Sequence, residues 1–163
     1  MKLRRRLRQA QPSSRASLPQ RKFQELIETG VIRVIKVAAA ADVGKAINPM
    51  TVEQQIEGGA VMGASNAILE SFSYRDGRIE NGSLADYKVA TIQDLPEIVP
   101  IIVESVHDEA PYGAKGVGEP AAAATPPAIA NALYDAIGVR IRDLPLTPEK
   151  VLEAMGKLHA NGG

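Results

Sequence analysis

The segment best suited to chemistry is residues 113–120, which read Gly-Ala-Lys-Gly-Val-Gly-Glu-Pro. Its closely spaced glycines allow backbone N–H groups to approach a ligand without obstruction by a Cβ atom. We predict that this loop leads directly into a helix, whose free N–H groups and dipole favour an anion. A phosphate or an oxo-metal group would suit such a place. The loop is not a P-loop, because no Ser or Thr follows its Lys.

Glu119 lies at the junction of this loop and the predicted helix, and two roles are open to it. In the first, it is simply an acid in the first helical turn, where the helix dipole stabilises its charge. In the second, it is held on a rigid support beside a bound ligand and acts as a general base. The spacing of the residues does not decide between these roles.

A second candidate is residues 53–59, which read Glu-Gln-Gln-Ile-Glu-Gly-Gly. Adjacent helical residues point about 100° apart, so Gln54 and Gln55 cannot serve one site equally. A glutamine amide offers donors and an acceptor, enough to recognise the edge of a heteroaromatic ring. The alternative is that both amides are solvated. Residues 86–88 (Asp-Tyr-Lys) form either a small polar network or a solvated strand edge.

The pattern of elements predicts an α+β fold, with mixed short strands and packed helices. Two strands are expected from runs of apolar and β-branched residues, over 31–39 and 98–106. A hairpin is expected at Asp76-Gly77. A short helix over 23–29 should end at Gly30, and Thr147 should cap a last helix over 148–157.

Two longer helices are expected between these elements. Asn48-Pro49 is a helix start, and the helix should run to about residue 71. Gly59, Gly63 and Ala67 recur every four residues on it, which predicts a very close neighbour on that face. The Ala-rich helix from Pro120 should be interrupted and restarted at Pro126-Pro127 and end at Gly138.

The composition narrows the classes of site. The 163 residues include no Cys and two His, which excludes a disulfide scaffold, a cysteine nucleophile, an iron–sulfur cluster on this chain and a multi-histidine metal site. We expect no metal ligand from its side chains. Aromatic residues make up 4% and there is no Trp, so the core must consist of aliphatic residues. No apolar run approaches the roughly 20 residues of a membrane span, and the expected localisation is cytoplasmic.

The net charge of zero hides an uneven distribution. Residues 1–22 hold eight of the 19 basic residues, and the remainder carries 11 basic against 19 acidic residues. This acidic body argues against nucleic acid as a partner, although the arm alone could bind nucleic acid or an anionic surface. Its composition also resembles a transit peptide. We expect residues 1–22 to be a basic, disordered arm.

Several segments, taken in order, resemble the C-terminal part of the molybdenum subunit of the xanthine dehydrogenase/aldehyde oxidoreductase family. The resemblance covers residues 30–155, and its order and spacing are more specific than any single motif. The segments are Asp42-Val43-Gly44-Lys45-Ala46-Ile47-Asn48-Pro49, Gln55-Ile56-Glu57-Gly58-Gly59, Ala85-Asp86-Tyr87-Lys88, Asp94-Leu95-Pro96, residues 113–120, Pro127-Ala128-Ile129-Ala130-Asn131-Ala132 and Leu144-Pro145-Leu146-Thr147-Pro148-Glu149-Lys150.

The resemblance implies that residues 30–158 are part of the molybdopterin-binding domain of a molybdenum hydroxylase. In that family a glutamate deprotonates a hydroxide on molybdenum, which attacks an electron-poor carbon, while hydride passes to a sulfido ligand. The matching glutamate here is Glu119. Gln55 matches a glutamine that hydrogen-bonds the pterin. The segment formed by Lys115, Gly116, Val117 and Gly118 would hold the pterin or the metal end through its amides.

The resemblance also implies partners. The family subunit is several times longer, so the remaining part of the molybdenum subunit would have to come from elsewhere, together with iron–sulfur and FAD subunits that carry FAD and [2Fe-2S] clusters. The chain would then be inactive alone and act on a small-molecule substrate within the assembly. Two residues depart from the family pattern: Gln54 replaces a common Gly and Met62 a common Gln. The alternative is a non-catalytic remnant or interaction module of the same fold.

Overall fold

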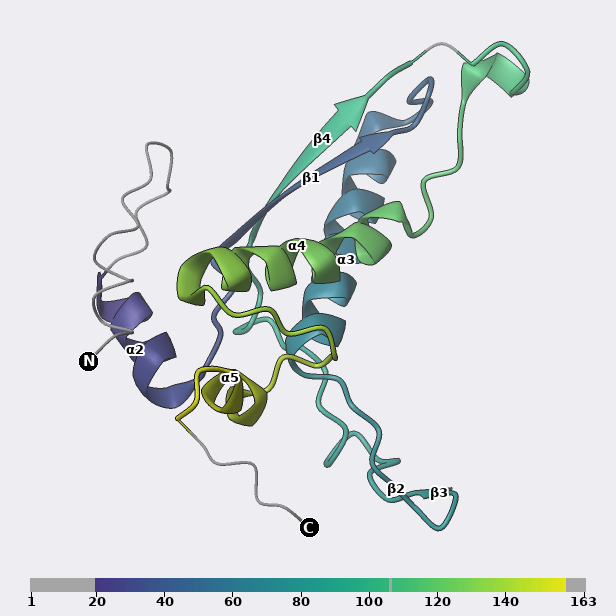
Figure 1. Ribbon diagram of the computed structural model, residues 1–163. Helices are drawn as coiled ribbons and strands as arrows, with labels where there is room; N and C mark the ends of the chain where they lie inside the picture. The colour runs from purple at the N-terminus through teal and green to yellow at the C-terminus, as the bar shows by residue number, and fades with distance from the viewer. Residues whose placement is uncertain (1–19, 106, 158–163) are drawn as a thin grey trace.

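The computed structural model of the chain describes residues 20–105 and 107–157 (Figure 1). It contains helices and a few short strands, which confirms the predicted α+β class. The elements are α2 (Gln20–Thr29), β1 (Lys36–Asp42), α3 (Pro49–Ile68), β2 (Tyr74–Arg75), β3 (Arg78–Ile79), β4 (Glu97–Val103), η1 (Pro111–Gly113), α4 (Pro120–Ile137) and α5 (Pro148–Ala154). Residues 1–19 of the expected basic arm lie outside the described residues, and its last three residues begin α2.

The strands β1 and β4 form a two-stranded parallel sheet, in register from Lys36 opposite Glu97 to Asp42 opposite Val103. The first strand therefore begins later and ends later than the predicted span of 31–39, which was wrong at both ends. The reason is tertiary: Ile32 and Val34 pack against the helical core instead of pairing with a strand. The described part of the second strand likewise ends at Val103, short of the predicted residue 106.

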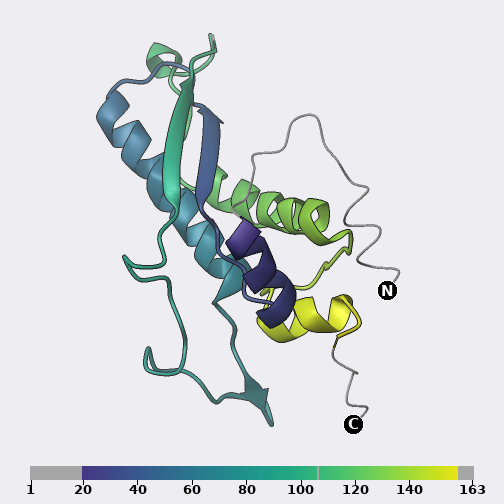
Figure 2. The same ribbon diagram turned by 90° about the vertical axis from the view of Figure 1, so that its left-hand side faces the viewer.

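Helix α3 begins as predicted. The Asn48 side chain accepts a hydrogen bond from the Thr51 N–H at 3.3 Å, and Pro49 occupies the first helical position. The helix ends at Ile68, about one turn before the predicted end, with Leu69 as its C-cap. Because α3 spans 20 residues, it connects the sheet at one end of the molecule with the helical core at the other (Figures 1 and 2).

The crossing of α3 and α4 is very close, as the four-residue spacing of small residues predicted (Figure 1). A Cβ atom added to Gly63 would lie 2.6 Å from the Ala122 carbonyl oxygen, and one added to Gly59 would lie 3.2 Å from Ala121 Cβ. These distances leave no room for a side chain at Gly63. The small-residue face therefore lets the backbones of two helices meet.

Helix α4 is continuous, so the predicted interruption at Pro126-Pro127 was wrong. The prolines remove two backbone donors and disfavour a helix, but tertiary packing prevails. The helix buries residues at four-residue intervals both before and after the proline pair. Packing of this one face keeps the two parts of the helix on a common axis. The buried residues are Ala121, Thr125, Ile129, Leu133 and Ile137. The helix ends as predicted at Gly138, which has φ of 72° and donates to the Tyr134 carbonyl.

The core consists of two clusters, one at each end of α3. The helical cluster joins α2, α4, α5 and the C-terminal half of α3, and includes Leu133, Leu146 and Val151. The sheet cluster joins β1, the N-terminal half of α3 and the start of α4, and includes Val43 and Ile56. Helix α5 starts at the predicted cap, where Thr147 Oγ1 accepts from the Lys150 N–H, but ends at Ala154.

Residues 69–96 form a segment that projects from the body (Figures 1 and 2). Its predicted hairpin turn is confirmed, because Asp76 and Gly77 both have positive φ between β2 and β3. Nearer the body, the Tyr87 hydroxyl donates to Glu70 at 2.6 Å. The Glu70 carboxylate raises the pKa of Tyr87, because the phenolate would lose this hydrogen bond.

No helix in the described part of the chain is both long and apolar enough to cross a membrane.

Candidate functional site

The glycine-rich loop is fastened to the turn that follows β1. The Lys45 N–H donates to the Gly113 carbonyl and the Lys115 N–H donates to the Val43 carbonyl, each at 2.8 Å, so that Gly44 and Ala114 form an antiparallel bridge. Gly44 has φ of +60°, and a Cβ atom there would lie 2.1 Å from the Gly113 oxygen. This position therefore requires glycine, although the Gly44-Lys45 pair is not part of a P-loop.

Side chains reinforce the bridge. Asp42 Oδ2 accepts from Lys115 Nζ at 2.8 Å and from Ser105 Oγ at 2.6 Å, and Lys115 Nζ also donates to Ser105 Oγ at 2.7 Å. The Lys115 ammonium, followed by the Ser105 hydroxyl and the Gly44 N–H, holds the pKa of Asp42 well below its usual range. Lys115 thus directs both its ammonium and its amide toward the chain itself.

Beyond Lys115 the loop changes character. A Cβ atom added to Gly116 or Gly118 would meet no atom within 4 Å, and neither residue has a positive φ. No hydrogen bond from the N–H groups of residues 116–118 to another described residue is present. The Val117 side chain packs against the sheet cluster and fixes the middle of the segment. Packing within the described chain therefore does not explain why these two residues lack side chains. We call residues 116–118 the bare segment, because their backbone is exposed.

Glu119 occupies the N-cap position of α4. Its backbone carbonyl accepts from the Ala122 N–H at 3.1 Å, but its side chain makes no capping hydrogen bond. The side chain is exposed. Its carboxylate is therefore not used to complete the helix end, which leaves it accessible to a group that approaches the loop.

Gln55 comes to the same place from α3. Its Nε2 lies 3.5 Å from the Gly118 carbonyl oxygen, at the outer limit of a hydrogen bond, although 63 residues separate the two in sequence. One turn further along the exposed face of α3, Gly58 has no atom within 4 Å of an added Cβ. The structure thus brings Gln55 beside the loop that carries Gly118 and Glu119.

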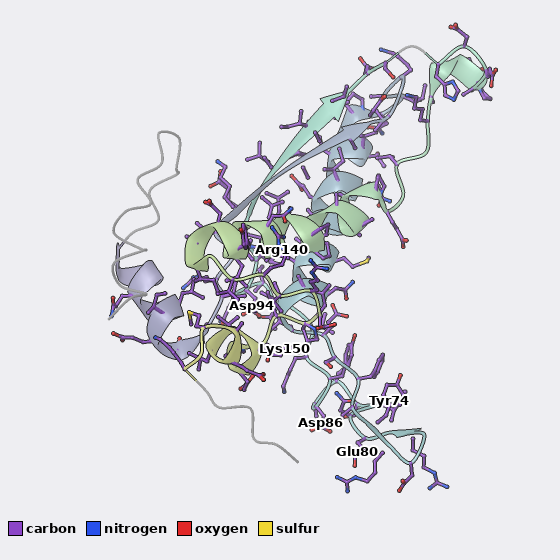
Figure 3. The ribbon with its side chains drawn as sticks, in the orientation of Figure 1. Tyr74, Glu80, Asp86, Asp94, Arg140 and Lys150 are labelled. Carbon is purple, nitrogen blue, oxygen red and sulfur yellow. The ribbon has the colours of Figure 1, made fainter. Side chains whose placement is uncertain are left out.

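The other polar candidates lie elsewhere. Asp86 and its neighbours belong to the projecting segment, where Figure 3 shows the side chains of Tyr74, Glu80 and Asp86 away from α4. Asp86 accepts from the Ser83 hydroxyl, Tyr87 donates to Glu70 and Lys88 donates to the Ala85 carbonyl, so residues 86–88 make separate polar contacts and lie outside the strands. Over residues 20–105 and 107–157, no group of three or more His, Asp or Glu side chains is arranged to hold a metal ion.

Sequence reasoning did not assign roles to Asp42, Gly44 or Gly58. The two residues of the turn were visible only as part of a matching segment, because their partners lie 63 to 73 residues away. Gly58 could have been found from the sequence, since glycine inside a helix is unfavourable by about 1 kcal/mol relative to alanine. A glycine at such a position indicates either close packing or a ligand.

Comparison with known proteins gives the class of the fold. Residues 27–96 match the family described as the molybdopterin cofactor-binding domain. The chain is 36% identical to the xanthine dehydrogenase molybdenum-binding subunit of Escherichia coli O157:H7 over 124 residues, which make up 75% of this chain and 16% of that protein.

Two solved structures are similar to the described fold. For quinoline 2-oxidoreductase of Pseudomonas putida 86 the TM-score is 0.76 at 35% identity, over 80% of this chain and 17% of that chain. For the aldehyde oxidoreductase of Desulfovibrio gigas the TM-score is 0.73 at 33% identity, over 80% of this chain and 14% of that chain. This chain therefore spans about a sixth of the length of such relatives.

The class defined by the fold and these matches is that of the molybdopterin cofactor-binding domains. More narrowly, the chain belongs to the molybdenum-binding subunits of the xanthine dehydrogenase/aldehyde oxidoreductase family, of which it represents a fragment. The predicted family and the predicted molybdopterin cofactor with its molybdenum are thereby confirmed. The family match covers Gln55 but ends at residue 96, before the glycine-rich loop, and none of the comparisons assigns a role to a residue, so the roles of Gln55, Glu119 and residues 115–118 stay predictions.

Proposed function

We propose that this chain supplies part of the molybdopterin site of a molybdenum hydroxylase, which hydroxylates an electron-poor carbon of a small molecule. Glu119 is the general base, and Gln55 binds the cofactor together with the backbone N–H groups of Gly116, Val117 and Gly118. Lys115, the first residue of this predicted binding segment, anchors it, because its N–H and its ammonium group are both bonded within the chain. The observation that carries this proposal is the 3.5 Å approach of the Gln55 amide to Gly118. It joins an amide from α3, bare loop backbone and the start of α4 in one exposed place.

The residues fit a pterin cofactor in a specific way. Gly58, Gly116 and Gly118 all face open space, so contacts within the described chain do not explain the lack of a side chain at any of them. A flat group lying against the backbone would explain all three, because each Cβ atom would hold it away. The N–H groups of residues 116–118, which make no hydrogen bond within the described chain, are donors suited to the oxygen-rich parts of such a cofactor.

These positions assign different roles to the cofactor, to Glu119 and to Gln55. When bound, the molybdenum cofactor supplies the oxygen-transfer and hydride-accepting chemistry. The Glu119 carboxylate accepts the proton, for which it must be accessible, and its side chain is exposed and makes no capping hydrogen bond. The Gln55 amide orients the cofactor by offering a donor and an acceptor at one edge. No side chain of this chain is proposed as a ligand of the metal.

The proposal requires partners: the remaining part of a molybdenum-binding subunit, with iron–sulfur and FAD subunits beside it. The Escherichia coli relative is named as a subunit, and this chain spans 16% of its length. The sheet supports the same view. Parallel sheets are normally covered on both faces, whereas the outer face of β1 and β4 presents Ala40, Ile101 and Val103 to the exterior. The predicted cytoplasmic location stays a prediction.

The first experiment measures cofactor content. The chain is purified alone and after co-expression with a polypeptide that carries the remaining part of a molybdenum-binding subunit. Molybdenum is measured by elemental mass spectrometry and pterin by fluorescence after oxidation. Stoichiometric molybdenum and pterin in the co-purified complex are the expected result. A stable complex that contains neither would contradict the proposal and favour the non-catalytic alternative.

The second experiment tests the base. In the loaded complex, Glu119→Gln should keep its molybdenum content but lose activity by roughly 10²–10⁴-fold, the usual effect of removing a general base. Glu153→Gln is the matched control, because Glu153 is an exposed acid of α5, a helix that packs in the helical cluster and contributes nothing to the proposed site. Full activity in Glu119→Gln would overturn the catalytic role while leaving cofactor binding intact.

A further inference from the structure

We propose that Asp42, at the end of β1, is a positioning residue for the candidate site. Through its ion pair with Lys115 it fixes the place of residues 116–118 and of Glu119. The consequence for catalysis rests on the proposed function, but the positioning itself is a property of this chain. Asp42 touches none of the proposed cofactor-binding atoms and acts only through Lys115.

The first step of the argument is the closed set of hydrogen bonds around Asp42. Its Oδ2 atom accepts from Lys115 and Ser105, while its Oδ1 atom accepts from the Gly44 N–H at 3.1 Å and the Ser105 N–H at 3.3 Å. One carboxylate therefore joins three chain segments: the turn after β1, the end of β4 and the glycine-rich loop. Hydrogen bonds to an ionised group are about twice as strong as neutral ones.

The second step is the position of Lys115 along the loop. Its N–H bond to Val43 is the last backbone hydrogen bond between described residues before the first bonds of α4. On the far side, Ala121 is buried in the sheet cluster against α3. The bare segment and Glu119 thus lie between two fixed points, Lys115 and Ala121, and Val117 packs against the sheet cluster. Moving the first anchor moves the segment.

The third step compares this ion pair with its neighbours. Lys45 and Glu104 pair at 3.1 Å beside the same turn, but their side chains are 61% and 46% exposed. Lys115 and Asp42 are 30% and 41% exposed, and Ser105 bonds to both of them, whereas Glu104 has one further partner, the Ala46 N–H. Exposed pairs contribute little because water screens them. The Asp42–Lys115 pair is the less exposed of the two and joins three chain segments, so it is better placed to define a geometry.

The experiment uses the full chain, without cofactor, and compares Asp42→Asn and Lys115→Met with the wild type by NMR. Asp42→Asn removes the charge and keeps the shape. Lys36→Met is the matched control, since Lys36 pairs with Glu97 at 2.6 Å at the opposite end of the same two strands. The readouts are hydrogen exchange at the bridge amides of Lys45 and Lys115, and backbone order parameters at Gly116 and Gly118.

Both variants should speed exchange at the bridge amides by about twofold, the size of change expected for a partly exposed ion pair. The order parameters of Gly116 and Gly118 should fall below about 0.6. Exchange within α3 should stay unchanged, and so should all of these values in Lys36→Met. Lys115→Arg should restore the order parameters, because a guanidinium group can still reach the Asp42 carboxylate. A general loss of stability would instead alter α3 and the loop together.

Unchanged exchange and order parameters in both Asp42→Asn and Lys115→Met would overturn the proposal, as would a change that extends equally through α3. The result is independent of the cofactor. If the two variants behave as expected while the complex never contains molybdenum, the positioning role stands and the proposed function fails. If the complex is loaded and active while the loop is insensitive to Asp42, the reverse holds.

Discussion

The two halves of α3 present opposite kinds of surface. The C-terminal half lies beneath α4, where Gly63 and Ala67 are buried and the helical cluster surrounds them. The N-terminal half is buried on one side only, and its other side exposes Gln55 and Gly58 beside the glycine-rich loop. One helix thus joins a packed core to an exposed, polar site.

The glycines make this difference quantitative. At Gly63 an added Cβ atom would collide with the backbone of α4, whereas at Gly58 it would meet nothing within 4 Å. The same contrast separates Gly44 in the bridge from Gly116 and Gly118 in the bare segment. A glycine without space for a side chain is explained by packing within the chain. A glycine with open space around it is not, and it indicates a position where a ligand could contact the backbone.

The largest expected effect is at the packed end. Gly63→Ala should destabilise the chain by about 1–3 kcal/mol, since the new methyl group lies 2.6 Å from a backbone oxygen that cannot move away without shifting α4. Urea denaturation followed by circular dichroism measures this change. A neutral result would mean that the two helices separate without penalty and that the comparison is unsound.

Gly58→Ala is the matched substitution in the exposed half of the same helix. It should stabilise the chain by about 0.5–1 kcal/mol, because alanine is the better helix former and its methyl group meets no neighbour. In the co-purified complex, the same variant should lower molybdopterin content if the face of Gly58 is part of the cofactor site. Stabilisation with unchanged cofactor content would restrict the site to the loop and Gln55.

A smaller effect on stability is expected in the bare segment. Gly116→Ala and Gly118→Ala should each change the free energy of unfolding by no more than about 0.5 kcal/mol, since each methyl group would enter open space. Both should nevertheless reduce the cofactor content of the complex, measured as molybdenum per chain. Substantial destabilisation would show that these glycines serve the fold and not the site.

The smallest effect concerns pH. The pKa of Asp42 is lowered in the folded chain, so its stabilising contribution is present above the ordinary Asp value of about 3.9 and is lost as the pH falls toward the lower folded value. Asp42→Asn should therefore be slightly less stable than wild type at pH 7, and the difference should narrow below about pH 4. Both partners are partly exposed, which keeps the effect small. Urea midpoints at neutral, mildly acidic and strongly acidic pH test the sign.

Local signals predicted the elements whose ends they cap. The Asn48-Pro49 start of α3, the Asp76-Gly77 turn and the Gly138 end of α4 are where the sequence indicated, because each depends on backbone geometry that a few neighbouring residues define. The errors fell where a distant partner decides. The first strand was displaced because apolar residues that suit a strand pack equally well against helices.

The site divides in the same way. The residue types in the loop and in residues 53–59 indicated a ligand, and the order of the segments indicated the family. The sequence could not show that Lys115 is held by Asp42, nor that Gln55 lies beside Gly118, because these contacts bridge 73 and 63 residues. For Glu119 the local context did indicate its place at the junction of loop and helix, because that place needs no distant partner, whereas its role stays a prediction.

The sequence by itself therefore determined the caps, the turns, the small-residue face of α3 and the family, because these reside in short segments and in their order. Tertiary structure alone decided where the strands pair, that α4 continues through two prolines, and which glycines are enclosed and which are bare. The physical reason is that burial and long-range hydrogen bonds outweigh local preferences of about 1 kcal/mol per residue. The candidate site forms where one such contact, between Gln55 and Gly118, lies beside backbone that the fold leaves exposed.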